Sequence, residues 1–439
     1  MADHLIRRSS ESFMAAKERA DAEMQAIANE ISTLVAAEGG TWQLTDTEGE
    51  IMVNAGGSVF PVSRRVLLMP YMKHRYISVL LMHHASGLPR DADGHIYLET
   101  SPAYFEAFLD ELTLYETGRT NTVELPPPKA ADPLYADYHA LFTREINCYA
   151  APQQTTPPHT ASTASTDNPT GSEDQAIQQY LKACEQFLRT HSAAIKQLQG
   201  VRDDIRCFLE AMEPFFASPD GSENEILSLT VLGRKVSMMR KTFSRLGPNH
   251  PLLTRFATTP PCWADRRVRQ TPTKCFVTTV EFARRIAVLP ACQLIRPPLL
   301  EEGGERHFID DIEMYGLRYQ PYCHLPAADG TDFIAKSAEE WGKVIDMTGK
   351  PSPRATLIYK SSRDTFEYPS FLNKVVGKSG LLFAIRQGDT HRFGAFVDGP
   401  LTAPQDPTKT NRYKAPLFFF SLSGAYETPT KIELPEERQ

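Results

Sequence analysis

A seven-residue apolar repeat in the middle of the chain constrains the fold more than any other feature. It extends from Ile177 to Met212 in alternating steps of four and three residues, which places its members on one stripe of a helix. His191 and Arg202 interrupt the stripe and are expected to weaken it. The same pattern is typical of a helix that packs on its own domain. We predict a coiled-coil helix over residues 173–216, with an oligomeric contact made by Leu181, Leu188, Ile195, Leu198, Ile205 and Leu209.

A shorter stripe of the same kind lies near the N-terminus, between Phe13 and Leu34. It predicts a helix over residues 1–40 that is a second candidate for a coiled coil. Residues 150–172, which precede the long helix, are rich in Pro, Thr, Ser and Ala. Such a composition cannot form a core, so we expect a flexible linker and a domain boundary there.

Positive charge is concentrated in one segment. The 439 residues carry 47 Lys+Arg and 54 Asp+Glu, a net charge of −7. Residues 226–299 hold 13 Lys+Arg and 2 Asp+Glu, whereas the rest of the chain holds 34 and 52. We expect this basic segment to contact protein, including acidic stretches of the same chain; a solvated surface and nucleic acid are the alternatives.

Length and composition limit the class of protein. The length exceeds what one core usually supports, which predicts two to four domains. The longest apolar runs are far shorter than the ~20 residues of a membrane helix, and the N-terminus lacks the apolar core of a signal peptide. Seven scattered cysteines favour reduced thiols and a cytoplasmic location.

Two segments on either side of the long helix share a pattern. Residues 51–68 align with residues 227–243 when Gly57 is placed on Gly233. A proline-led helical pattern follows each glycine by about 40–45 residues, at Pro102 and at Pro272. The glycines predict hairpin turns and the prolines predict first turns of helices. We infer an internal repeat, with a coincidental pattern as the alternative.

The first copy carries the segments VNAGGSVF at 53–60, DADGHIY at 91–97 and SPAYF at 101–105. In this order they resemble the BTB/POZ domain in its potassium-channel tetramerisation form, although Ala55 and Thr100-Ser101 depart from the family pattern. The resemblance implies a self-associating domain over residues 48–149, with the motif residues Gly56, Gly57, Phe60, Asp93, Gly94, Pro102, Tyr104 and Phe105. Residues 223–320 resemble a degenerate copy without the double glycine and the Asp-Gly turn.

Residues 355–366 read ATLIYKSSRDTF, and GKSGLLF, RFGAF and FFFSLS follow at 377–383, 392–396 and 418–423. These segments resemble the TLDc domain, expected here over residues 330–439 and short at its C-terminal side. The matching residues are Tyr359, Ser362, Asp364, Phe366, Phe371, Phe393, Gly394 and Ser421. Thr365 stands where the family has glycine. Short strands at 357–359, 381–385, 393–397 and 417–422 by themselves predict sandwich-like packing.

Motifs for catalysis are incomplete. Gly377-Lys378-Ser379 lacks the glycine that a phosphate-binding loop needs at position 372, where Leu372 stands. Ser423 lacks the flanking glycines of a nucleophile elbow. His83 and His84 are adjacent and point about 100° apart on a helix, so they cannot easily share an ion. We predict no catalytic residue, no cofactor and no metal.

Together these features predict a multidomain α+β protein with BTB/POZ-like domains, a coiled-coil helix and a TLDc-like domain. We expect a non-enzymatic, homo-oligomeric scaffold that presents the TLDc-like domain to a protein partner. The resemblance implies contact with a proton-pump subunit or a role in protection against oxidative stress. An adaptor that binds a cullin-type ubiquitin ligase is the alternative, and an enzyme in the TLDc-like domain is a third possibility.

Overall fold

The computed structural model describes residues 2–44, 46–149, 173–247, 250–257, 271–289, 293–300, 305–322, 335, 338–350, 357–388, 390–404, 406 and 409–435. The predicted linker at 150–172 lies outside these residues. The chain divides into two compact units, residues 1–125 with 141–241 and residues 126–140 with 242–439. The predicted mixture of helices and strands is confirmed.

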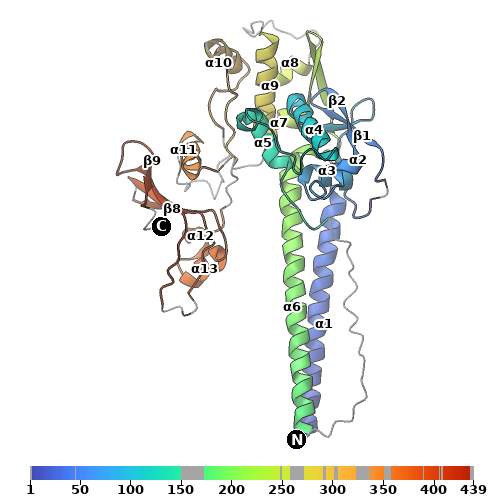
Figure 1. Ribbon diagram of the computed structural model, residues 1–439, viewed down its shortest axis with the longest axis vertical. Coiled ribbons are helices and arrows are strands. Elements are labelled where there is room, and N and C mark those ends of the chain that lie inside the picture. Colours follow the sequence, from blue (N-terminus) through green and yellow to red (C-terminus); the bar gives the residue numbers. More distant parts are fainter. Residues whose placement is uncertain are drawn as a thin grey trace. The chain divides into compact units, whose positions relative to one another are not determined.

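Two long helices of the first unit lie side by side (Figure 1). They are α1 (Ala2–Ala37) and α6 (Glu173–Met212), which confirms both predicted helices. The pairing is parallel: the Phe13 and Phe187 rings contact each other near one end, and Glu30 pairs with Arg206 further along. Pro214 follows α6 within a short 3-10 turn, η3 (Glu213–Phe215), as expected of a residue that cannot continue a helix.

The first repeat forms a three-stranded sheet with order β2-β1-β3. Strands β1 (Glu50–Ala55) and β2 (Ser58–Ser63) make an antiparallel hairpin, and β3 (Ile96–Leu98) pairs with β1 in parallel. The helices are α2 (Arg64–Leu67), α3 (Tyr76–His83), α4 (Pro102–Glu116) and α5 (Pro133–Phe142), with the 3-10 turns η1 (Ala85–Gly87) and η2 (Lys129–Ala131). Pro102 begins α4 and the Ser101 hydroxyl caps it, as the sequence predicts.

The second repeat has the same order of hairpin and helices. Strands β4 (Ile226–Val231) and β5 (Arg234–Met239) form the hairpin, with Leu232 and Gly233 both at positive φ in the turn. The helices are α7 (Arg240–Leu246), α8 (Pro251–Ala257) and α9 (Thr273–Val288). Pro272 precedes α9 directly. The region that would match β3 lies outside the described residues. The division into units separates this repeat, since β4 and β5 belong to the first unit.

The end of the chain forms a four-stranded antiparallel sheet with order β6-β7-β8-β9. The strands are β6 (Leu381–Gln387), β7 (His391–Val397), β8 (Leu417–Ser423) and β9 (Thr430–Glu433). Helices α10 (Glu305–Met314), α11 (Ala338–Thr348), α12 (Ser361–Asp364) and α13 (Tyr368–Val375) precede it. Trp341, Val344 and Ile345 of α11 share a core cluster with Phe396 and Phe420 of the sheet.

Two details of this region differ from the prediction. Residues 357–359 are not a strand; the Tyr359 hydroxyl and the Lys360 amide make hydrogen bonds to the turn that follows. The sheet packs on a helix and, among the described residues, no second sheet is stacked on it, so the predicted sandwich is not seen there. Within the part of the chain that the structure describes, no helix is long and apolar enough to cross a membrane.

Candidate functional site

The glycines of the first hairpin meet the second repeat. Gly56 and Gly57 both have positive φ, as a two-residue hairpin turn requires. The Gly56 carbonyl accepts a hydrogen bond of 2.9 Å from the Ser237 amide in β5. A side chain on Gly57 would place its Cβ 2.6 Å from the Lys235 carbonyl oxygen. The turn is therefore a docking point for the outer edge of β5, and Gly57 is needed for the approach as well as for its backbone conformation.

Glu99 completes this docking point. Its carboxylate accepts a hydrogen bond of 2.6 Å from the Met239 amide, two residues beyond Ser237 on the same edge. The turn of the first repeat can bind the outer edge of β5, but the outer edge of β2 cannot bind a hairpin turn in the same way. In the alignment of the two repeats, Pro61 of β2 stands where Ser237 stands in β5, and proline has no amide hydrogen to donate. The outer edge of β2 therefore cannot repeat the contact with another hairpin turn.

The predicted oligomeric stripe of α6 faces α1 of the same chain. Along the pair, Phe13 packs on Phe187, and His191 lies 3.3 Å from Asp21. Burial along the stripe increases toward the C-terminal end of α6: Leu181 is 45 % exposed, Leu188, Ile195 and Leu198 are half-buried, and Ile205 and Leu209 are buried. The stripe thus has a partner within the chain, and self-association through it stays a prediction.

A buried histidine joins the ends of α1, α3 and α6. The carbonyl of Glu38 can only accept, so Nδ1 of His84 donates to it at 3.1 Å and Nε2 accepts from the Tyr149 hydroxyl at 2.8 Å. Phe208 and Phe216 pack against the ring. Burial is the main reason that the pKa of His84 is lowered to about 4; the hydrogen bond to Glu38 opposes this shift and neighbouring His83 adds to it. The imidazole is a structural group of the core at neutral pH.

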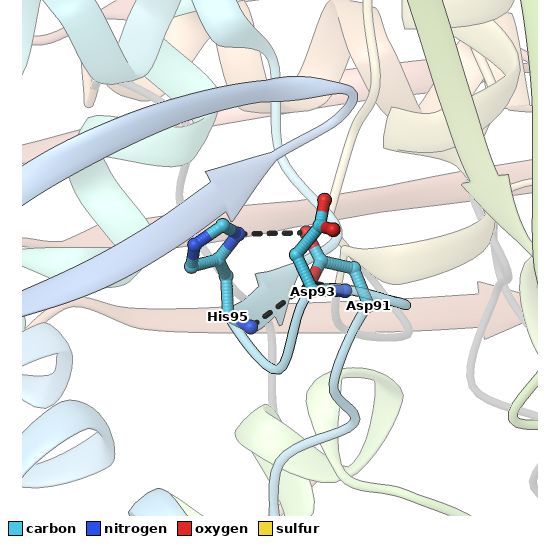
Figure 2. A group of neighbouring side chains, drawn as sticks. All are labelled: Asp91, Asp93 and His95. Atoms are coloured by element: carbon cyan, nitrogen blue, oxygen red, sulfur yellow. Dashed lines mark hydrogen bonds and ion pairs between the residues drawn. The ribbon is translucent and has the colours of Figure 1, made fainter.

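The Asp-Gly turn brings Asp91, Asp93 and His95 together (Figure 2), with one ligand atom of each within 4.8 Å of the others. The carboxylate of Asp91 accepts from the amides of Asp93 and His95 and from the Asn54 side chain, and it contacts the His95 ring at 3.2 Å. These contacts occupy the carboxylate oxygens of Asp91 and stabilise the turn. Gly94 is at φ +82, as the turn requires. The cluster has the contacts of a structural turn.

Of the other residues that carry the resemblance to the BTB/POZ motif, two lie in the core of the first repeat. Tyr104 and Phe105 of α4 are fully buried. The Phe60 ring lies 5.6 Å from that of Phe105 and connects β2 to the helix. These side chains position the sheet on α4 and leave no reactive group exposed.

Several cations of the basic segment are used internally. Arg284 and Arg285 of α9 are fully buried and pair with Glu281 and Asp137, respectively. In the first unit, Lys241 pairs with Glu213 at 2.8 Å and donates to two backbone carbonyls. Among the described cations these three are therefore withdrawn from solvent; Arg266, Arg267 and Arg269 lie outside the described residues.

The packed face of the C-terminal sheet contains a buried ion pair. Arg392 of β7 is 6 % exposed and binds both carboxylate oxygens of Glu340 in α11, at 2.6 and 2.8 Å. Gly394 leaves room for the Phe420 ring and for the Phe383 carbonyl. Sequence reasoning included Gly394 but missed the ion pair, because spacing alone does not reveal which acidic residue lies opposite Arg392.

The turn between α12 and α13 holds an exposed aromatic side chain in place. The Tyr359 hydroxyl donates to the Thr365 carbonyl at 2.7 Å, and the Lys360 amide donates to the Asp364 carboxylate at 2.9 Å. Thr365 has φ +70, a conformation that a β-branched residue rarely adopts. Phe366 follows it and is 86 % exposed.

The TLDc domain family matches residues 339–431. This part of the chain is a TLDc domain. No curated protein and no solved structure matches the chain.

Within the TLDc domain, the remaining predicted residues are distributed over both sides of the sheet. Phe371 of α13 packs between Tyr359 and Phe383. Ser421 of β8 is buried, whereas Phe393 of β7 is 37 % exposed. Ser362 lies in α12. The predicted residues therefore do not converge on one cavity, and the structure brings together only those near the Thr365 turn.

Proposed function

We propose that the chain is a non-enzymatic, homo-oligomeric scaffold that presents its TLDc domain to a protein partner. The observation that carries this proposal is Phe366, a large apolar side chain that is 86 % exposed on a turn held by two hydrogen bonds. An aromatic side chain in a fixed, exposed position is typical of an interface anchor, because little conformational entropy is lost on binding.

The partner we propose is a subunit of the vacuolar proton pump, as the TLDc resemblance implies; protection against oxidative stress is the other role that the resemblance implies. The two repeats would be BTB/POZ-type domains, and the protein would act in the cytoplasm. Support for a BTB/POZ-type fold comes from the repeated order of hairpin and helices and from the glycine turns at Gly57 and Gly233.

The test is binding of the full chain to purified vacuolar proton pump, measured by biolayer interferometry. Phe366→Asp should weaken binding at least tenfold. Leu232→Asp is a matched control, because Leu232 is likewise a large apolar side chain, 87 % exposed in a turn. Equal binding by the Phe366→Asp variant would contradict the role of this side chain, and no binding by the wild type would contradict the choice of partner.

A cullin adaptor is the second candidate. In that case the exposed side of α4 would form the docking surface, since Glu106 and Asp110 are exposed there and most apolar residues of the helix are buried. Binding of a purified cullin that is abolished by Asp110→Lys would favour this function over the first. Peroxide turnover by the full chain would favour the third reading, an enzyme.

A further inference from the structure

Two connections meet at one end of the TLDc sheet. Residues 376–380 precede β6, and residues 398–416 join β7 to β8. The strand register aligns Leu381, Val397 and Leu417 at this end, so both connections leave the sheet side by side. All of these residues belong to the second unit of the chain. The two connections can therefore form one surface.

Hydrogen bonds join the two connections. The Gly377 amide donates to the Leu401 carbonyl at 2.8 Å, and the Leu401 amide donates to the Lys378 carbonyl at 3.2 Å. The Thr402 amide donates to the Tyr413 hydroxyl at 3.1 Å, which holds the end of the longer connection against its beginning. These contacts place Lys378 and the residues around Tyr413 on either side of the same short segment, Leu401 and Thr402.

Positive charge gathers on this surface. Both acidic side chains of the two connections lie beside a lysine: Asp398 is 2.7 Å from Lys350, and Asp406 is 3.8 Å from Lys409. Four further cations are exposed, one of them at the end of α13, and none has an ion pair in the part of the chain that the structure describes. We call these four residues the basic patch: Lys374, Lys378, Arg412 and Lys414.

The surroundings of the basic patch restrict the class of anionic partner. Like charges that lie close together repel each other, and an anionic partner relieves this repulsion. Nucleic acid that is bound without sequence preference stacks on several aromatic rings, whereas the two connections contain only Tyr413. An anionic membrane favours bulky apolar side chains beside the cations, and the connections contain no Trp, Phe, Ile or Met. An acidic protein segment requires neither feature.

We propose that the basic patch binds an acidic segment of a partner protein, one that carries several Asp or Glu side chains in succession. The guanidinium of Arg412 binds a carboxylate through two parallel N–H donors, and the three lysines act as point charges. Exposed ion pairs are individually weak, so binding requires several of the four cations at once. This inference rests on the protein partner of the proposed function and specifies the chemistry of that partner.

The experiment is a fluorescence anisotropy titration of the full chain against a labelled peptide of ten glutamates. The wild type should bind the peptide at 0.1 M salt and lose at least tenfold in affinity at 1 M, because the screening length falls from about 10 Å to about 3 Å. The patch variant should bind at least tenfold more weakly than the wild type at 0.1 M salt. This variant combines Lys374→Gln, Lys378→Gln, Arg412→Gln and Lys414→Gln.

A matched control removes the same number of charges from exposed positions of the first unit, and its affinity for the peptide should stay within twofold of the wild type. The control combines Lys182→Gln, Lys196→Gln, Arg234→Gln and Lys235→Gln. Glutamine keeps much of the length of each side chain, and circular dichroism checks that both variants are folded.

The outcomes separate this inference from the proposed function. Absence of peptide binding by the wild type, or equal affinities of the patch variant and the control, overturns the basic patch as a site for acidic segments. Phosphatidylserine vesicles and a single strand of oligothymidine are titrated in parallel, and tighter binding of either one through the patch would overturn the choice of a protein partner. A wild type that binds the peptide but not the proton pump keeps the patch and contradicts the pump as the partner.

Discussion

Gly57 combines two requirements for glycine, a backbone at positive φ and a close contact with a neighbouring strand. Gly57 and Gly233 were both expected to form hairpin turns, and both do. They differ in their surroundings, because Gly57 faces the backbone of β5 and Gly233 has no atom near its missing Cβ. The turn could be predicted from the sequence, since it depends on local φ. The contact with Lys235 could not, since it joins segments far apart in the chain.

Gly57→Ala should therefore destabilise the protein more than Gly233→Ala. Both variants place a side chain at positive φ, which costs about 1 kcal/mol. Only Gly57→Ala adds a clash with the Lys235 carbonyl, for which we expect a further ~1–3 kcal/mol. Urea unfolding of the full chain measures the difference, and equal losses in the two variants would contradict the docking of β5 on this turn.

His84 should make stability depend on pH. Its pKa of about 4 in the folded chain lies below its ordinary value, so the unfolded chain binds the proton more readily. Stability is then complete above pH ~6.5 and falls between pH ~6.5 and 4, by up to ~1.4 kcal/mol per pH unit. Protonation of Nε2 also removes the acceptor of the Tyr149 hydroxyl.

Urea unfolding at pH 7, 6 and 5 checks this dependence. His84→Gln cannot titrate, so its stability at pH 7 should be lower and its decline toward pH 5 shallower. His83, whose pKa burial also lowers, remains in the variant and accounts for a residual slope. If the stability of the His84→Gln variant declines toward pH 5 as steeply as that of the wild type, His84 is not the source of the pH dependence.

At the scale of elements, the sequence predicted helices and strands better than their partners. Periodicity defines the stripe of α6 because it depends on the helix itself, and the strands β6, β7 and β8 follow from their short apolar runs. The apolar periodicity does not show which element packs against the stripe. The pairing with α1 rests on contacts between Phe13 and Phe187 and between Glu30 and Arg206, which sequence spacing does not reveal.

Leu188→Asp should loosen the α1–α6 pair. The substitution places a charge in the half-buried seam, which should cost about 2 kcal/mol or more. Ala193→Asp lies on the exposed side of the same helix and should cost less than ~1 kcal/mol. Thermal unfolding followed by circular dichroism at 222 nm compares the two, and similar losses would mean that the stripe is not packed.

Ser237→Pro tests the one-way contact between the repeats. Proline removes the amide that donates to Gly56 and makes β5 resemble β2, in which Pro61 holds the matching position. Amide exchange in β4 and β5 should become faster. Ser237→Ala keeps the amide and removes the hydroxyl that contacts Ser228, so its exchange should stay close to that of the wild type.

At the scale of the whole molecule, the sequence suggested oligomers through the α6 stripe and through the two repeats. In the structure the stripe packs on α1, and the Gly56–Gly57 turn packs on β5 of the same chain. The basic segment behaves similarly, since Arg284, Arg285 and Lys241 pair with acidic residues of their own unit. The uneven charge distribution therefore corresponds in part to internal ion pairs. The TLDc domain is the exception, because Phe366 is exposed on its turn.

The pairing of α1 with α6 inside one chain is the central claim, and a disulfide cross-link tests it most directly. Phe13→Cys and Phe187→Cys would be combined in a chain whose native cysteines are replaced by serine. These positions face each other, since the centroids of the two rings are 5.6 Å apart. After oxidation, a denaturing gel should show a cross-linked product with the mass of one chain. A product with the mass of two chains would show that the helices pair between copies and would contradict the account.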